Sequence, residues 1–144
     1  MSEIRSRLFG AWQLARWTIT YDDGRAPTLP FGEAVVGLLI YSNDGHMSGS
    51  IARAGRKPLS SESARTAPAE EKITAFETFF SYAGTYHVEG DEVIHHVTMA
   101  LYPNLVGTVQ RRQMRFSDQG LELSAADLLP GSAVKRTHRL QWCR

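Results

Sequence analysis

The sequence predicts an all-β protein, an up-and-down antiparallel barrel of about eight strands with one helix and one long loop. Three observations support this fold class. Short runs rich in β-branched and aromatic residues dominate the 144-residue chain. Turn signals such as Asp44-Gly45 and Gly90-Asp91 separate the runs at intervals that suit a β-meander. The number of runs is one that can close a barrel around a single small ligand.

The predicted strands follow one another without a crossover. They lie in residues 10–24, 35–53, 84–104, 106–128 and 134–144. Each of the three middle segments contains one internal turn and therefore gives two strands, whereas the first and last segments give one strand each. All of them belong to one domain, residues 1–144, because a chain of this length fits the usual size of a single domain.

One segment, between the third and fourth strands, breaks the β pattern. Residues 52–71 are polar and rich in Ser, Ala and Arg, which predicts a long irregular loop. Residues 68–84 then predict a helix, with a proline at its start, two glutamates in its first turn and a glycine at its end. Ile73, Phe76 and Phe80 would share one face of this helix. The helix would either pack on the barrel wall or form a plug or lid over the barrel mouth.

Composition restricts the class of protein. Apolar residues make up 42% of the chain, which is enough to bury a core, yet no run of 18 apolar residues predicts a membrane span. The first ten residues lack the apolar region of a signal peptide, and Cys143 is the single cysteine, so we expect a cytoplasmic protein without a disulfide. A net charge of +1 argues against a nucleic-acid or membrane partner.

These motifs resemble those of the bacterial lipocalin-like domain family, a short cytoplasmic branch of the calycin-type barrels. The resemblance spans nearly the whole chain and is carried by Gly10–Leu14, Gly37–Ser48, Phe79–Val88, His95–Arg112 and the closing residues 140–144. It implies an eight-stranded barrel with an interior cavity for a small, mostly apolar molecule. It also implies that the Gly-x-Trp element packs across the closed end beneath an arginine of the last strand, either Arg139 or Arg144.

Strand alternation identifies polar side chains that should point into the barrel. His95 is in phase with Val93, Val97 and Met99, while its neighbour His96 is on the other face. On the following strands, the residues in phase with the apolar set are Gln110, Arg112, Met114 and Phe116, then His138, Leu140 and Trp142.

The first strand and the second hairpin leave two orientations open. Trp12 and Leu14 would bring Arg16 inward, but Trp17, Ile19 and Tyr21 prefer the opposite phase, so we expect a bulge near Ala15. An outward set of Trp17, Ile19 and Tyr21 would suit a homodimer face, or it would be covered by the helix. Tyr41 faces outward if Asp44-Gly45 is a two-residue loop and inward if the loop is longer.

Arg112 raises the question of what an inward guanidinium contacts, since no carboxylate is evident on the predicted interior face. Backbone carbonyls, Tyr86, water or an anionic or carbonyl-bearing ligand would serve. A metal site is not predicted: His95 and His96 diverge on a strand, and His95 with His138 lacks a third ligand. No nucleotide-binding or cofactor motif is present, so no cofactor is expected.

Two functions remain open. The first is a cofactor-independent isomerase, cyclase or lyase acting on a small hydrophobic carbonyl compound, with His95, Arg112 and His138 as catalytic residues. The second is a carrier or sensor for an apolar acid, in which the same residues only anchor the ligand. In both, the predicted polar ligand-binding residues are Gln110, Tyr86 and Tyr82. The apolar ones are Met99, Val97, Met114, Phe116, Phe76, Phe80, Leu140 and Met47.

Overall fold

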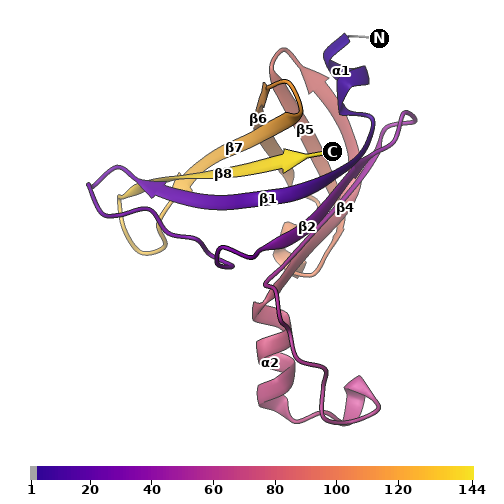
Figure 1. Ribbon diagram of the computed structural model, residues 1–144, viewed down its shortest axis with the longest axis vertical. Helices are drawn as coiled ribbons and strands as arrows, with labels where there is room; N and C mark the ends of the chain where they lie inside the picture. The colour runs from indigo at the N-terminus through magenta and orange to yellow at the C-terminus, as the bar shows by residue number, and fades with distance from the viewer. Residues whose placement is uncertain (1–2) are drawn as a thin grey trace.

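The computed structural model describes residues 3–144 and confirms the predicted barrel. Within these residues, eight antiparallel strands form one closed sheet in which each strand pairs with the next and β8 returns to β1 (Figure 1). The strands are β1 (Gly10–Tyr21), β2 (Val36–Tyr41), β3 (His46–Ala52), β4 (Phe79–Glu89), β5 (Glu92–Ala100), β6 (Val109–Phe116), β7 (Gly120–Leu128) and β8 (Lys135–Cys143). The helices are α1 (Glu3–Leu8) and α2 (Ala69–Glu77), with short 3-10 turns at Ala64–Thr66 and Pro103–Leu105. No helix of the described part is long and apolar enough to cross a bilayer.

Helix α1 covers one end of the barrel. Its last residue, Leu8, is completely buried, and the carbonyl of Leu8 accepts a hydrogen bond of 2.9 Å from the indole nitrogen of Trp12. The guanidinium of Arg144 lies 3.8 Å from the centroid of the Trp12 ring and donates to the carbonyl of Arg7 at 2.6 Å. Arg139 instead faces the outside of the barrel. Arg144, the residue directly after β8, is therefore the arginine that seals the closed end.

The β2–β3 turn decides the orientation of Tyr41. Ser42 pairs with His46 through a backbone hydrogen bond, so the loop between them contains three residues, and Gly45 ends it with φ = 95°. A three-residue loop with glycine in the left-handed region is a common hairpin geometry. The longer-loop alternative is thus confirmed, and Tyr41 points inward with 1% of its surface exposed.

The same loop length determines which residues of β2 face the interior. A two-residue loop would have turned Leu38 and Ile40 inward, but they are 45% and 40% exposed, while Leu39 is buried. One additional loop residue shifts the strand by one position, and a shift of one position exchanges its two faces.

Two bulges set the phase of the longer strands. The register of β1 shifts between Leu14 and Arg16, as predicted, so Arg16 is exposed whereas Trp17 and Ile19 turn inward. The outward apolar set on which the expectation of a homodimer face depended is therefore absent. Ile19 is buried and Trp17 packs against the core.

The second bulge lies between β4 and β5. Ala83 pairs with Met99 but Gly84 pairs with Val97, which leaves Thr98 as the extra residue. A side chain at position 84 would overlap the carbonyl of His96, so the bulge requires glycine there. Beyond the bulge the faces exchange. The prediction that Met99 shares the interior face is wrong, since Met99 is 65% exposed.

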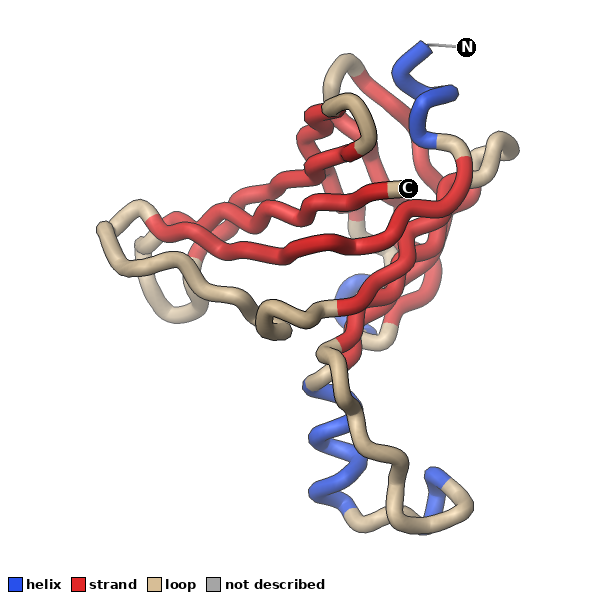
Figure 2. The backbone as a smooth tube through the Cα atoms, in the orientation of Figure 1, coloured by secondary structure: helices blue, strands red, loops and turns tan. Residues whose placement is uncertain are grey.

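Helix α2 is shorter than predicted and leaves the barrel. It ends at Glu77, and Phe79 already begins β4, in which Phe80 pairs with Ile51 of β3. Tertiary pairing with β3 overrides the helical spacing of these aromatics. Figure 1 shows α2 extending away from the sheet, and Figure 2 shows the long loop from β3 that leads to it. Both expected positions, on the wall and as a plug, are wrong, and the predicted ligand contact Phe76 is 47% exposed.

Candidate functional site

A cavity of about 430 Å³ lies inside the barrel and receives side chains from all eight strands. The predicted catalytic residues His95, Arg112 and His138 all line it. Of the predicted ligand-binding residues, Gln110, Tyr82, Phe80, Leu140 and Met47 line it as well. The cavity opens toward the β5–β6 connection, where Tyr102 and Leu105 form part of its rim.

Five predicted ligand-binding residues besides Phe76 are not part of the cavity wall. Tyr86, Val97 and Met114 are buried elsewhere in the barrel, and the Tyr86 hydroxyl donates to the carbonyl of Ser42. Phe116 packs beneath the guanidinium of Arg7 at the closed end, 4.2 Å from ring centroid to guanidinium. Met99 faces outward after the bulge. Alternation selects the interior face but does not distinguish the packed part of the interior from the hollow part.

His95 lies between two tyrosines. Its Nε2 is 2.6 Å from the hydroxyl of Tyr41, and its Nδ1 is 2.6 Å from the hydroxyl of Tyr82. Strands β2, β4 and β5 each contribute one member of this chain, and the imidazole is 2% exposed. Both ring nitrogens therefore have partners inside the protein wall.

Burial of the Tyr41 hydroxyl fixes the direction of these hydrogen bonds. Among the described residues, Tyr41 has no hydrogen-bond partner other than His95. If Nε2 carried the proton, Tyr41 would have to accept it, and its own hydroxyl hydrogen would be buried without an acceptor, which is costly. Tyr41 therefore donates to Nε2, and Nδ1 donates to Tyr82. The hydroxyl hydrogen of Tyr82 remains available to the cavity.

His95 is neutral at physiological pH. Desolvation by burial, followed by the positive charge of Arg112 and by His96, lowers the pKa of His95 to about 3. Desolvation also raises the pKa of Tyr82, although the nearby Arg112 guanidinium opposes this rise. Burial raises the pKa of Tyr41 well above its usual value. The chain Tyr41–His95–Tyr82 is thus an uncharged hydrogen-bond array whose last donor faces the cavity.

Arg112 is a cavity-lining cation without an acidic partner. Its guanidinium donates to the carbonyl of Arg111 at 3.0 Å and to Gln110 Oε1 at 3.4 Å. No carboxylate among residues 3–144 forms an ion pair with it. Gln110 is held in turn, because its Nε2 donates to Thr108 Oγ1 at 2.8 Å. The backbone carbonyl proposed as one partner is confirmed, and the guanidinium leaves most of its five donors for a ligand or water.

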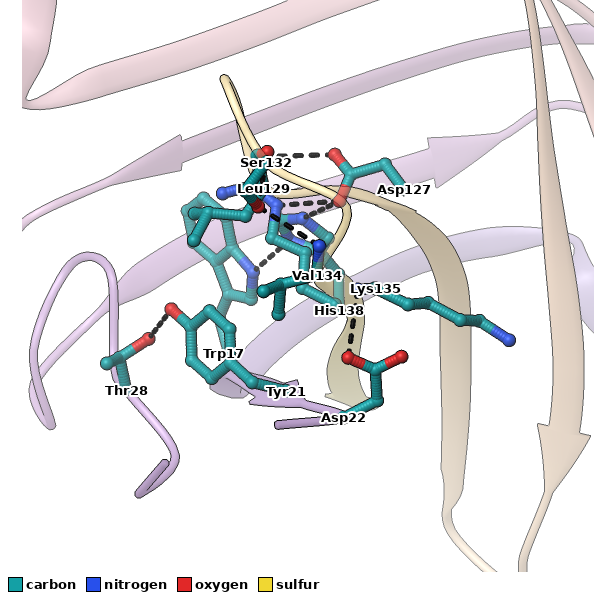
Figure 3. A network of polar contacts seen from close by, with 11 residues as sticks. Trp17, Tyr21, Asp22, Thr28, Asp127, Leu129, Ser132, Val134, Lys135 and His138 are labelled. Atoms are coloured by element: carbon teal, nitrogen blue, oxygen red, sulfur yellow. Dashed lines mark hydrogen bonds and ion pairs between the residues drawn. The ribbon is translucent and has the colours of Figure 1, made fainter. Parts of the chain in front are cut away.

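His138 belongs to a second polar group, toward the open end. Figure 3 shows its imidazole between Trp17 and Asp127. The Trp17 indole donates to His138 Nδ1 at 3.3 Å, and His138 Nε2 lies 3.5 Å from Asp127 Oδ1. Arg136 binds the same carboxylate through two nitrogens, at 2.6 and 3.0 Å. Desolvation lowers the pKa of His138, although the Asp127 charge opposes this.

Sequence reasoning missed several residues of the wall. Asp127 carried a detectable signal, since it is in phase with the buried Leu121 and Leu123 on β7. It supplies a carboxylate at the exposed end of the cavity, to Arg136 and His138 rather than to Arg112. Trp142 was placed on the inner face without a role. Its indole nitrogen is buried and makes no hydrogen bond within the described residues.

Acidic and metal-binding side chains do not converge in the barrel. No group of three or more His, Cys, Asp or Glu residues among residues 3–144 is placed to hold a metal ion. The polar chemistry of the cavity is therefore that of hydrogen bonds, two imidazoles, the cations Arg112 and Arg136, and the Asp127 carboxylate paired with Arg136.

Comparison with known proteins identifies a family and a relative of this chain. A family model described as a lipocalin-like domain matches residues 9–144. The 4'-hydroxy-3'-methoxypropiophenone carrier protein of Aspergillus oryzae is 29% identical over 104 residues, covering 67% of this chain and 94% of that protein.

Two solved structures are similar in fold. One is a lipocalin-like protein from Bacteroides uniformis, with a TM-score of 0.46 and 14% identity over 95% of this chain and 97% of that one. The other is an uncharacterized protein from Bacteroides eggerthii, with a TM-score of 0.47 and 12% identity over 95% of this chain and 99% of that one.

Proposed function

The chain belongs to the lipocalin-like domain family, and from this premise we propose that its barrel binds a small, largely apolar molecule that carries a carbonyl, phenolate or carboxylate oxygen. The observation that supports this most directly is Arg112, a cation that lines a mostly apolar cavity without a carboxylate partner. The relative from Aspergillus oryzae supports the same class of ligand, because it is named as a carrier of an aryl ketone.

Placing the Arg112 guanidinium in the cavity without a carboxylate partner among the described residues has a desolvation cost, and a bound ligand would reduce it. Removing a charged group from water is unfavourable unless hydrogen bonds compensate it. The contacts of Arg112 within the wall, to the Arg111 carbonyl, to Gln110 and to the Tyr82 hydroxyl oxygen, leave part of its donor capacity unused. A ligand oxygen bound there would form charge-assisted hydrogen bonds, which are about twice as strong as neutral ones.

The rest of the wall suits the apolar part of such a ligand. Leu39, Met47, Phe80, Leu123 and Leu140 supply most of the nonpolar surface around the polar groups. The volume of about 430 Å³ falls within the range of roughly 300–1,000 Å³ that is usual for small-molecule sites. A single substituted aromatic ring with a short side chain is a ligand of this size.

Binding is tested by titration with 4'-hydroxy-3'-methoxypropiophenone, followed by the fluorescence of Trp17 and Trp142, which line the cavity. Arg112→Met should weaken binding about 10- to 100-fold, because a hydrogen bond to a charged group is worth about 1.5–3 kcal/mol. Arg115→Met is the matched control, since Arg115 lies on the same strand with its side chain 78% exposed. Absence of binding to the wild type, or equal affinity in both variants, would contradict the proposal.

A second candidate is catalysis without a cofactor, as an isomerase, cyclase or lyase on the same carbonyl compound. The observation that favours it is His138, an imidazole beside the Asp127 carboxylate that lines the same cavity as Arg112. His138 would remove a proton next to the carbonyl, and Arg112 with Tyr82 would stabilise the negative oxygen. The pKa of about 3 and the short 2.6 Å contacts of His95 favour His138 as the base, acting through Nδ1 once the substrate displaces the longer, 3.3 Å hydrogen bond from Trp17.

Deuterium exchange separates carriage from catalysis. The ketone is incubated with the protein in D₂O, and exchange at the carbon next to the carbonyl is followed by NMR. Catalysis predicts exchange above the protein-free rate, lost in His138→Asn while the dissociation constant stays within about threefold. If exchange occurs at the protein-free rate although the ketone binds, the catalytic candidate is refuted and the carrier function remains.

A further inference from the structure

The indole nitrogen of Trp142 is an unsatisfied donor in the cavity wall. Trp142 is only 4% exposed, and its Nε1 has no hydrogen-bond partner in the described part of the chain. Buried indole N–H groups usually find a partner, and each one that does not calls for an explanation. Other atoms of Trp142 line the cavity while Nε1 itself is closed to water, so a ligand acceptor reaches this group when the indole shifts as the ligand binds.

Two further donors face the same space. The hydroxyl hydrogen of Tyr82 is left for the cavity, since its oxygen accepts from His95 in the arrangement that satisfies Tyr41. Arg112 has guanidinium hydrogens beyond those given to Arg111 and Gln110. Tyr82 and Arg112 thus present hydrogens to the ligand volume directly, and Trp142 holds a third in the wall behind it.

The acceptors of the wall are, in contrast, already used. His138 Nδ1 accepts from Trp17, and Asp127 is held by the two nitrogens of Arg136 and by His138. Gln110 Oε1 accepts from Arg112. Apart from Asp127, which is exposed at the open end, the acceptors of these wall side chains are therefore engaged by one another.

We infer that the cavity selects ligands by their hydrogen-bond type: it accepts oxygens that only accept hydrogen bonds and rejects groups that must donate, so that an acidic hydroxyl is bound as its anion. This inference rests on the proposed function and deepens it. A donor group on the ligand would be buried without an acceptor, whereas a ketone, ether or phenolate oxygen would satisfy Trp142, Tyr82 or Arg112.

Three aryl ketones of nearly equal size test the inference: the 4'-methoxy, 4'-hydroxy and 4'-amino propiophenones. The methoxy compound offers acceptors only and should bind well. The amino compound is neutral at pH 7 and must bury two N–H groups, so it should bind about tenfold or more weakly. The hydroxy compound should bind with the absorption band of its phenolate, and its ionisation should occur at lower pH when bound than when free.

Two tryptophan variants make the test specific. Trp142→Phe keeps an aromatic ring but removes the free donor, so the methoxy compound should bind about 3- to 10-fold more weakly. Trp17→Phe releases His138 Nδ1 as an acceptor, so the preference for the methoxy over the amino compound should fall. Circular dichroism verifies that both variants keep the wild-type fold.

The outcomes separate the inference from the function on which it rests. If none of the three ketones binds, the proposed function fails together with the inference. If all three bind with equal affinity, or the amino compound binds best, ligand binding stands and the donor-only cavity is refuted. If the bound hydroxy compound showed the absorption of the neutral phenol, the inference that an acidic hydroxyl is bound as its anion would be refuted.

Discussion

The two ends of the barrel differ in how they satisfy their interior. At the end covered by α1, Leu8 and Trp12 are buried, and the indole N–H of Trp12 has a backbone acceptor. Beyond this end the strands surround a cavity, and in the cavity wall the indole N–H of Trp142 has no hydrogen-bond partner among residues 3–144. The same kind of side chain is therefore satisfied at the packed end and unsatisfied beside the cavity.

This difference indicates where stability and function lie. Close-packed interiors gain dispersion and hydrophobic energy from every contact, and a cavity gives up part of both. The cavity wall also contains His95 and His138, whose charged forms are disfavoured by burial, and the cation Arg112, which has no carboxylate partner among the described residues. We therefore expect the closed end to contribute most of the folding stability, and the region around the cavity to contribute less because its side chains are arranged for a ligand.

The largest effect is expected from Trp12→Ala at the closed end. Loss of a buried tryptophan costs about 3–5 kcal/mol, because apolar contacts are lost and a void remains. Trp17→Ala, which only enlarges a cavity already present, should cost less than about 2 kcal/mol. Urea unfolding measures both free energies. If Trp17→Ala proved as costly as Trp12→Ala, the two ends would not differ in the way described.

The next effect is the pH dependence that His95 gives the region around the cavity. Its pKa is about 3 in the folded protein against 6.5 for an unperturbed histidine, so the unfolded chain binds more protons between these values. Stability should therefore fall as the pH decreases through this window and be unaffected above it. The contribution is about 2–3 kcal/mol between pH 6 and pH 4.

His95→Gln isolates this contribution, because glutamine is able to hydrogen-bond both tyrosines but does not titrate. Urea unfolding of both proteins at pH 7, 6, 5 and 4 gives the difference between their stabilities. That difference should change with pH by the amount stated. Parallel curves for wild type and variant would mean that His95 is already protonated or exposed in the folded protein.

A smaller effect is expected from Arg144→Leu, which sharpens the account of the closed end. The variant loses the cation–π contact with Trp12 and the hydrogen bond to the Arg7 carbonyl. Together these should be worth about 1–2 kcal/mol in urea unfolding. Arg139→Leu is the control on the same strand and should change stability by less than about 0.5 kcal/mol. Equal losses of unfolding free energy in the two variants would mean that Arg144 stabilises the barrel no more than Arg139 does.

Much of this architecture could be predicted from the sequence, since turn residues and alternation are local signals. Alternation placed His95, Gln110, Arg112 and His138 on the inner face, and all four line the cavity. The bulge near Ala15 was also predictable, because the apolar phase changes there.

The errors have a physical cause, namely one-residue shifts that no local pattern reveals. The three-residue loop at Asn43–Gly45 exchanges the faces of β2, and the bulge opposite Gly84 turns Met99 outward. The contact of Tyr41 and Tyr82 with His95 joins three strands, so it depends on how the closed sheet positions them. The predicted length of helix α2 was wrong for a related reason, because Phe80 pairs with β3 and so belongs to strand β4.

The smallest effect is expected from His96→Ala, which tests the contrast between two adjacent histidines. His96 points outward, stacks on His87 with ring centroids 5.0 Å apart, and bonds to it on the exposed surface. Because solvent can replace both interactions, the variant should lose no more than about 0.5 kcal/mol in urea unfolding and keep the wild-type ligand affinity in the fluorescence titration. His95→Gln, one residue away, should instead change how stability depends on pH. If His96→Ala changed the pH dependence of stability as His95→Gln does, or weakened ligand binding, the two faces of β5 would not be separated as described.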